Sequence, residues 1–216
     1  MEISLERYRL AALPGKFAHP NDRRRVPRAS DRFFHGTLLL TGDNLQFQQT
    51  LNEWFGSPKQ SWKLLFRASL HGYSASAFHE HCDNHSPTFV IVSCHDGDLC
   101  GGFTDVPWSS PSDCHGRYAT SEKSFLFTLI NRIIQPPTKF GVVKKRLAIV
   151  HHRNFGPIFG GGADLAISDN CDSNMESYSN LPHSYDGHGA SNRVLMGDYN
   201  FYVKDYEVFT RSQGVR

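Results

Sequence analysis

Hydrophobic residues in the first third of the chain recur at the spacing of an α-helix. Within residues 43–55, Phe47, Leu51, Trp54 and Phe55 follow the i, i+4, i+7, i+8 pattern that places side chains on one helical face. The spacing therefore predicts an amphipathic helix that packs one apolar face against the rest of the protein.

The ends of this helix and of a second one carry sequence signals. Asp43, followed three residues later by Gln46, resembles a capping box at the start. Gly56 and Pro58 predict where the first helix stops. A second, shorter helix is predicted after Ser74 as N-cap, with an apolar face formed by Ala75, Phe78 and Cys82.

Other segments alternate between apolar and polar residues, which predicts strands. Trp62 to Ala68 alternates in this way. The β-rich runs 88–94 and 99–104 flank His95-Asp96-Gly97-Asp98, and an Asp-Gly pair in that position predicts a hairpin. The remaining predictions are strands at 125–130, 147–152, 164–168 and 200–210, with loops at the glycine-rich segment 156–162 and the polar stretch 168–192.

Short strands separated by turn signals, with few helical patterns, favour an α+β protein. We expect a two-sheet antiparallel β-sandwich flanked by helices. Residues 1–30 hold several prolines and six of the 15 arginines with little periodicity, so they are predicted to form a flexible N-terminal tail or linker. Residues 31–216 are predicted to form one compact domain.

Charge and composition exclude some classes of function. The 23 basic and 21 acidic residues leave a net charge of +2, and the dense basic runs are short, at 23–25 and 144–146. A dedicated nucleic-acid-binding domain usually has a higher pI and clustered basic residues, so this role is not favoured. No apolar run approaches the ~18 residues needed to span a bilayer.

The chain contains five cysteines, which are Cys82, Cys94, Cys100, Cys114 and Cys171. Charged residues interrupt the N-terminal segment, which is not the pattern of a signal peptide. We therefore expect reduced thiols in a cytoplasmic protein, with peripheral association at organelle membranes only through a partner.

The densest group of potential ligands is His79-Glu80-His81-Cys82-Asp83, with His85 just beyond. Thiolate and imidazole are zinc ligands, but His79 and His81 are two residues apart, whereas the zincin pattern places histidines four apart. Cys82 beside His81 is the best candidate for a nucleophilic cysteine, although a small buried thiol on the apolar helix face is the simpler interpretation. We interpret the group as structural.

Three further features invite a functional interpretation. Gly160-Gly161-Gly162 does not match a phosphate-binding loop and precedes a predicted strand, so these glycines are expected to allow positive φ and close backbone approach. Glu207 and Asp164 are carboxylates within apolar strand segments. We expect each to accept hydrogen bonds from loop backbone or to pair with a base such as Arg67, with a polar binding or acid/base site as the alternative.

The segment from Trp62 to Thr104 resembles the opening half of the TLDc domain family. The matching residues are Trp62, Leu65, Arg67, Ala68, Ser69, Gly72, Phe78, His79, Cys82, Asp83, Thr88, Gly101, Gly102, Phe103 and Thr104. The resemblance continues through Trp108-Ser109, 124–129, 156–167, Ser184-Tyr185 and 201–209. The main departures are His71, where the family commonly has aspartate, and the triple glycine at 160–162.

The resemblance implies a sandwich of two antiparallel sheets with flanking helices and no established catalytic centre. It also implies that Trp54 covers one face of a core formed by Leu64, Phe66, Phe89, Ile91, Phe125, Phe127, Ile149 and Phe201. TLDc proteins are associated with resistance to oxidative stress, and several bind the vacuolar-type proton ATPase.

The leading hypothesis is therefore a non-enzymatic interaction module that binds this ATPase, uses no cofactor or metal, and supports oxidative-stress tolerance. One alternative is a redox-active protein that uses Cys82 or Cys100. Another is a metal-binding enzyme that uses His79, His81 and Cys82. The residues that contact a partner are not assigned by the sequence.

Overall fold

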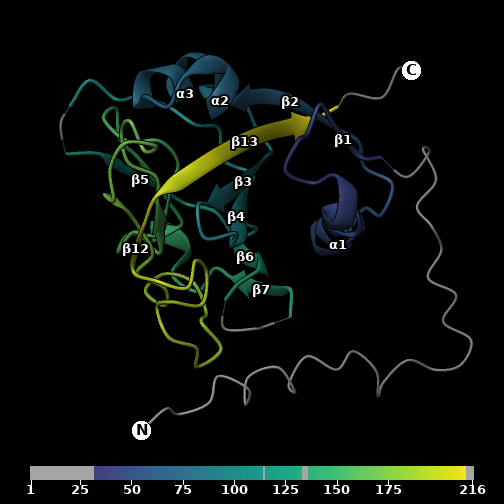
Figure 1. The fold of residues 1–216 in the computed structure, drawn as a ribbon. Helices are drawn as coiled ribbons and strands as arrows, with labels where there is room; N and C mark the ends of the chain where they lie inside the picture. Colours follow the sequence, from purple (N-terminus) through teal and green to yellow (C-terminus); the bar gives the residue numbers. More distant parts are fainter. Residues whose placement is uncertain (1–31, 114, 133–135, 213–216) are drawn as a thin grey trace, which may run out of the picture.

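The computed structural model describes residues 32–113, 115–132 and 136–212, which form two β-sheets packed face to face with helices outside them (Figure 1). This arrangement confirms the predicted α+β sandwich. One ladder differs from the expectation of antiparallel sheets, because β1 pairs with β2 in parallel. The proposed tail at 1–30 lies outside the described residues, and the domain boundary stays a prediction.

The first sheet has seven strands in the order β1-β2-β13-β3-β4-β6-β7. Their bounds are β1 Phe34–His35, β2 Trp62–Arg67, β3 Thr88–Cys94, β4 Leu99–Thr104, β6 Phe125–Ile130, β7 Thr138–Gly141 and β13 Val203–Arg211. The second sheet has six strands in the order β12-β11-β10-β9-β8-β5. Their bounds are β5 Arg117–Ala119, β8 Ile149–His151, β9 Ile158–Phe159, β10 Leu165–Ala166, β11 Ser177–Tyr178 and β12 Asn200–Phe201.

Three α-helices and two short 3₁₀ turns accompany the described strands: α1 Gln46–Phe55, α2 Ala68–His71, α3 Ala75–Cys82, η3 Gly42–Asn44 and η4 Lys145–Leu147. The second predicted helix is confirmed as α3, where Ser74 Oγ accepts a hydrogen bond from the Ala77 amide at 3.2 Å. Gly56 ends α1 in the left-handed conformation, as its position predicts.

Some sequence predictions were wrong in detail. The capping box does not form, because η3 precedes α1 and the Gln46 side chain donates to the Asp43 backbone carbonyl instead. Ala68 begins α2 rather than ending a strand. The segments predicted as loops contain β9 and β11, whose two residues each are too few to show a period.

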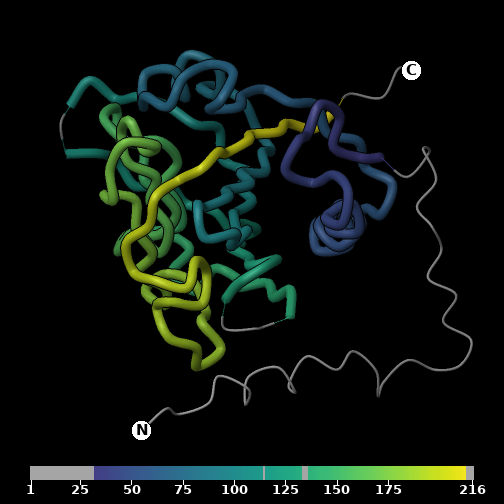
Figure 2. The backbone as a smooth tube through the Cα atoms, viewed as in Figure 1, coloured from purple at the N-terminus to yellow at the C-terminus, as the bar shows by residue number. Residues whose placement is uncertain are grey.

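Strand β13 holds the seven-stranded sheet together because it lies between β2 and β3 (Figures 1 and 2). The last long described segment of the chain, yellow in Figure 2, thereby pairs with two segments from its first half. Closing contacts between such distant parts of a chain costs loop entropy, which the packing on both faces of the strand must offset.

The seven-stranded sheet has a hydrophobic core on each face. Between the two sheets, Phe66, Val90, Leu126 and Val208 pack with residues of the second sheet such as Phe159. On the opposite face, Phe34, Trp62, Phe89, Phe125 and Phe209 pack with Phe47 and Leu51 of α1. The expected core residues are buried except Leu64, which is partly buried, and Trp54 contacts Phe127 with ring centroids 6.0 Å apart.

Two glycines of β4 lie in close contact with their surroundings, Gly102 with the facing sheet and Gly101 with the neighbouring strand β3. A Cβ atom at Gly102 would lie 2.6 Å from the Phe159 ring of the facing sheet. A Cβ at Gly101 would lie 1.9 Å from the carbonyl oxygen of Val90. Glycine is therefore required at these positions by contact rather than by backbone conformation.

We expect Gly102→Ala to lower the free energy of unfolding by about 1–3 kcal/mol, because the added methyl group overpacks the inter-sheet core. Gly141→Ala in β7 is the matched control, since a Cβ there would meet no atom within 4 Å. Urea unfolding followed by circular dichroism measures both. Equal midpoints for the two variants would contradict this account of the sheet contact.

Candidate functional site

His79, at the end of α3, is held on both ring nitrogens. Its Nδ1 lies 2.8 Å from Asp83 Oδ1, and its Nε2 lies 3.1 and 3.0 Å from the carbonyl oxygens of His152 and Phe155. The other Asp83 oxygen accepts a hydrogen bond from Ser110 Oγ at 2.7 Å. In a catalytic triad the imidazole lies between hydroxyl and carboxylate, whereas here the carboxylate lies between the other two. The arrangement ties α3 to two loops.

The other members of the sequence cluster point elsewhere. The His81 ring stacks on His71 with centroids 4.1 Å apart, and its Nδ1 donates to the Ala77 carbonyl. Cys82 is completely buried in the core, as its place on the apolar helix face predicts. Within residues 32–113, 115–132 and 136–212, no three His, Cys, Asp or Glu side chains come together as a potential metal site.

The thiols in the described part of the chain, Cys82, Cys94, Cys100 and Cys171, are all buried. Burial raises the pKa of each, and that of Cys171 reaches about 12. The thiolate is the reactive form of cysteine, so these environments suppress nucleophilic and redox chemistry. Cys114 lies outside the described residues. The geometry around Cys82 and Cys100 therefore gives no support to the redox alternative.

His79 and Asp83 each shift the pKa of the other. Burial lowers the pKa of His79, but the hydrogen bond and charge of Asp83, together with the two carbonyls, outweigh it and raise the pKa overall. Burial likewise raises the pKa of Asp83, and its bonds to His79 and Ser110 more than reverse that effect. Both ring nitrogens of His79 face acceptor oxygens, so this geometry favours an imidazolium beside the Asp83 carboxylate.

Glu207 is a fully buried carboxylate at the centre of β13. It accepts hydrogen bonds from Arg67 Nε at 2.9 Å, Thr37 Oγ1 at 2.7 Å and the Leu38 amide at 2.7 Å. Arg67 also donates to the Gly36 carbonyl. This confirms the expected pairing with Arg67 and shows that Glu207 fastens the loop after β1 to the sheet.

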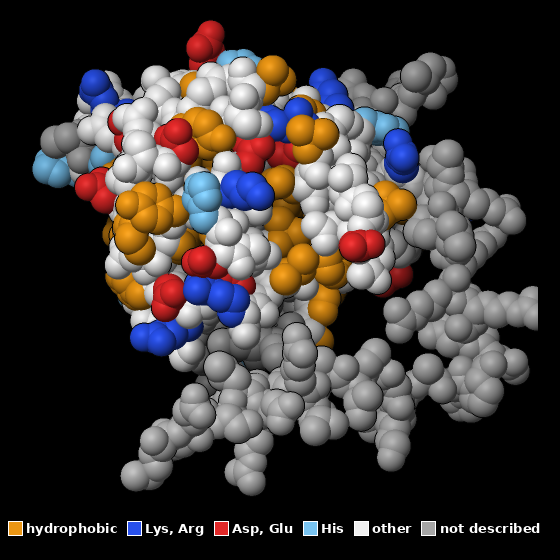
Figure 3. Space-filling view, in the orientation of Figure 1, with side chains coloured by type: hydrophobic (Ala, Val, Ile, Leu, Met, Phe, Trp, Pro, Cys, Tyr) orange, Lys and Arg blue, Asp and Glu red, His pale blue; other side chains and the backbone are white. Residues whose placement is uncertain are grey.

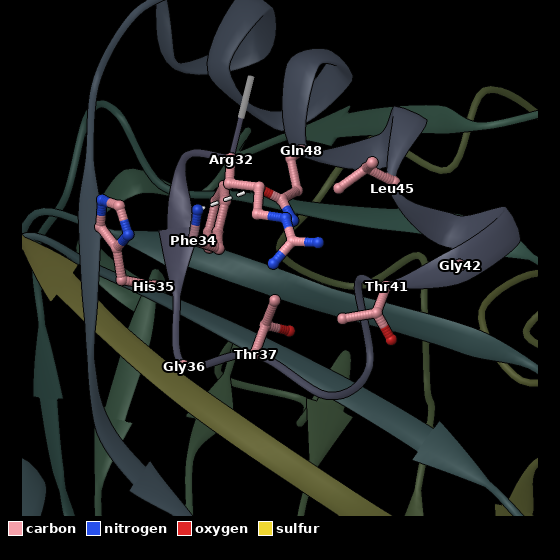
Figure 4. Close-up of a pocket in the computed structure, with 9 residues that line it drawn as sticks. All are labelled: Arg32, Phe34, His35, Gly36, Thr37, Thr41, Gly42, Leu45 and Gln48. Atoms are coloured by element: carbon pink, nitrogen blue, oxygen red, sulfur yellow. Dashed lines mark hydrogen bonds between the residues drawn. The ribbon is translucent and has the colours of Figure 1, made fainter. Parts of the chain in front are cut away.

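A small pocket of about 170 Å³ lies in that loop (Figure 4). The guanidinium of Arg32 extends over it between Thr37 and Gln48. The Gln48 amide bonds the backbone at Phe33, Phe34 and Leu40, and Thr41 Oγ1 donates to the Leu38 carbonyl. Most polar groups of the pocket are thus engaged in shaping the loop, which leaves few to bind a substrate.

Asp164 is the second buried carboxylate, and it organises a turn. Its oxygens accept hydrogen bonds from the backbone amides of His183, Ser184 and Tyr185 at 2.6–3.2 Å. Burial raises its pKa, and the three amides oppose that shift. A Cβ at Gly160, whose φ is +86°, would lie 1.8 Å from Asp164 Oδ2. The structural interpretations of Asp164 and of this glycine are both confirmed.

Sequence reasoning missed one charged cluster. Arg132 pairs with Asp96, Asp98 and Asp198 at 3.3, 2.9 and 3.0 Å, and donates to the Met196 carbonyl. Asp96 and Asp98 lie within the predicted hairpin turn, on either side of Gly97, but their basic partner is 34 residues away from Asp98. Only the fold brings these groups together. They tie the β3–β4 turn to the loop before β12.

The sequence of this chain matches a known domain family. The model of the TLDc domain family matches residues 33–212, which is most of the chain. The chain belongs to the TLDc domain family. Cys82 and Gly102, which are among the residues that resemble the family, are both buried in this TLDc domain.

This TLDc domain is similar to parts of larger proteins. It is 31% identical over 75 residues to MTOR-associated protein MEAK7 of Mus musculus, a match covering 35% of the chain and 16% of that protein. It is 29% identical over 104 residues to TBC1 domain family member 24 of Xenopus laevis, covering 47% and 17%. The chain thus spans far less than two thirds of either relative.

The His79–Asp83 pair predicts a specific pH dependence of stability. Because the pKa of His79 is raised above its ordinary 6.5, its contribution is full below 6.5 and is lost as the pH rises through the folded-state value. The contribution of Asp83, whose pKa is lowered from 3.8, is lost as the pH falls through its folded-state value. The pair therefore contributes most to the free energy of unfolding between pH 3.8 and pH 6.5, the ordinary pKa values of the two side chains.

We expect the stability advantage of the wild type over Asp83→Asn to shrink as the pH rises from 6.5 to about 8.5. Urea titrations of both proteins across that range measure it. A difference that stays constant or grows above pH 6.5 would contradict a charged His79.

We expect Glu207→Gln to lower the free energy of unfolding by about 3–5 kcal/mol, because Arg67 loses its buried partner. The Leu38 amide should also exchange with deuterium faster, since its acceptor is weakened. Glu122→Gln is the control, because Glu122 pairs with Lys145 at an exposed position. The anchor role of Glu207 fails if both variants unfold at the wild-type urea midpoint.

Proposed function

We propose that this TLDc domain is a non-catalytic module that acts by binding another protein. The observation that carries the proposal is the use of its reactive groups inside the fold. Glu207 and Asp164 are saturated with internal hydrogen bonds, His79 is held on both nitrogens, and burial raises the pKa of Cys82 and Cys100. Such groups are occupied in holding the architecture rather than in turning over a substrate.

The surface offers apolar side chains instead. In the part of the chain that the structure describes, the exposed large hydrophobic residues are Leu38, Leu70, Tyr118, Val143, Met175, Tyr199 and Tyr202. Figure 3 shows hydrophobic side chains, in orange, gathered over the region of β12. Tyr178 and Tyr199 stack there with centroids 5.5 Å apart. Tyrosine and methionine are enriched in protein interfaces, which supports a binding role.

We further propose the vacuolar-type proton ATPase as a partner and protection against oxidative stress as the biological role. Both follow from the association of TLDc proteins with this enzyme and this response. The helices in the described part of the chain are too short or too polar to cross a membrane. A cytoplasmic protein that reaches an organelle membrane through its partner fits the proposal. The relative MEAK7 is by its name associated with MTOR.

The test is a pull-down with immobilised chain and the purified cytosolic and membrane sectors of the ATPase, each supplied separately. We expect one sector to be retained at micromolar protein and released by free chain. An unrelated β-sandwich domain of similar size and pI serves as the control for charge. If the folded chain retains neither sector, or retains no more than the control, the ATPase proposal is wrong.

A further inference from the structure

Helix α1 is too small to cover the outer face of the seven-stranded sheet. Its ten residues make a helix about 15 Å long, whereas seven strands spaced about 4.8 Å apart span about 29 Å. Hydrophobic side chains consequently gather in the hollow between α1 and the strands β4, β6 and β7 (Figure 3).

One hollow beside α1 has a volume of about 500 Å³. We call it the aromatic groove, and define it by Trp54 and Phe55 of α1, Phe103 of β4, Phe125 of β6 and Lys139 of β7. The rings of Phe103 and Phe125 stack with centroids 5.1 Å apart, and Phe55 lies 5.4 Å from Phe103. The groove can therefore accept an aromatic or large aliphatic side chain.

A cation without an acidic partner lies in this groove. The Lys139 ammonium is 4.2 Å from the centroid of the Phe125 ring and 2.8 Å from the Trp54 carbonyl oxygen. That carbonyl belongs to the last turn of α1, where the helix dipole supplies only a partial negative charge. Among the residues that the structure describes, Lys139 forms no ion pair. An ammonium has three donors, so it can still bind an incoming acceptor.

The charged residues that line the groove, taken together, leave an excess of positive charge. Asp105 accepts a hydrogen bond from Ser121 at 2.6 Å, and Glu122 pairs with Lys145 at 3.2 Å. Lys123 is exposed, and it forms no ion pair with any residue of the described ranges. The lining therefore has three cations, Lys123, Lys139 and Arg211, against the carboxylates of Asp105 and Glu122, and Glu122 already pairs with Lys145. An apolar floor with unpaired cations is complementary to an acidic, partly apolar ligand.

We propose that the aromatic groove binds an acidic protein segment, with an aromatic or large aliphatic side chain between the groove walls and carboxylates at Lys139 and Lys123. This inference rests on the proposed protein-binding function and assigns it a surface and a partner chemistry. Phe103 and Phe125 are buried and stack on each other, which leaves no open ring face for a base, and the carboxylates of Asp105 and Glu122 in the lining would repel phosphates. The groove therefore favours a protein segment over a nucleic acid or a lipid headgroup.

The test uses three synthetic peptides of equal length with the full chain. The first has a central Phe flanked by Glu and Asp, the second replaces that Phe with Ser, and the third replaces the acidic residues with Lys. Binding is read from tryptophan emission, because Trp54 is partly exposed at the groove whereas Trp62 and Trp108 are buried. We expect the first peptide to bind more tightly than the other two, and the binding to weaken with salt.

Variants of the chain locate the binding. Lys139→Gln keeps an amide donor for the Trp54 carbonyl but removes the charge, and we expect it to weaken binding of the first peptide about three- to tenfold. Lys123→Gln should weaken it less. Lys63→Gln on β2 removes an equal charge at an exposed position outside the groove and should leave the affinity unchanged. Urea midpoints establish that each variant is folded.

The inference is overturned if the first peptide binds no better than the other two, or if Lys63→Gln weakens it as much as Lys139→Gln. Retention on anionic lipid vesicles without peptide binding would also overturn it. Failure here is distinguishable from failure of the proposed function, because a chain that still retains an ATPase sector while ignoring the peptides binds its partner through another surface.

Discussion

The buried ion pair between Glu207 and Arg67 is the interaction on which the arrangement of the seven-stranded sheet depends. Glu207 has no exposed surface, so its charge must be matched within the fold. Only one register of β13 against β2 places it opposite Arg67, and a shift by one residue would turn the carboxylate to the other face. The same carboxylate binds Thr37 and Leu38, which positions the loop that leads into α1.

The two faces of this sheet are covered unequally, and that asymmetry links the fold to its proposed role. One face meets a complete second sheet, so closely that Gly102 contacts the Phe159 ring directly. The other face meets one ten-residue helix. Beside that helix lies a hollow lined by aromatic side chains and by Lys139, which has no acidic partner among the described residues. The proposed binding role therefore depends on this incomplete coverage, while the His79, Glu207 and Asp164 side chains hold the fold together.

Local signals predicted a good part of this structure. The Ser74 cap, the buried face of α3 and the hairpin of β3 and β4 each depend on residues within one turn or one loop, so the chain reveals them directly. The pairing of Glu207 with Arg67 was also predictable, because a carboxylate in an apolar strand requires a partner. Strands β9 and β11 were missed because two residues show no period, and the capping box failed because η3 precedes the helix.

The sequence alone determined the family, the sandwich and the buried state of residues such as Cys82, because periodicity and ordered motifs record which side chains must avoid water. Tertiary structure alone decided which distant groups meet. Arg132 gathers three carboxylates, His79 reaches the carbonyls of a loop more than 70 residues away, and Lys139 meets the end of α1. These contacts depend on how the sheets and helix pack in three dimensions. No local spacing encodes that packing, since long-range contacts form only when the whole core closes.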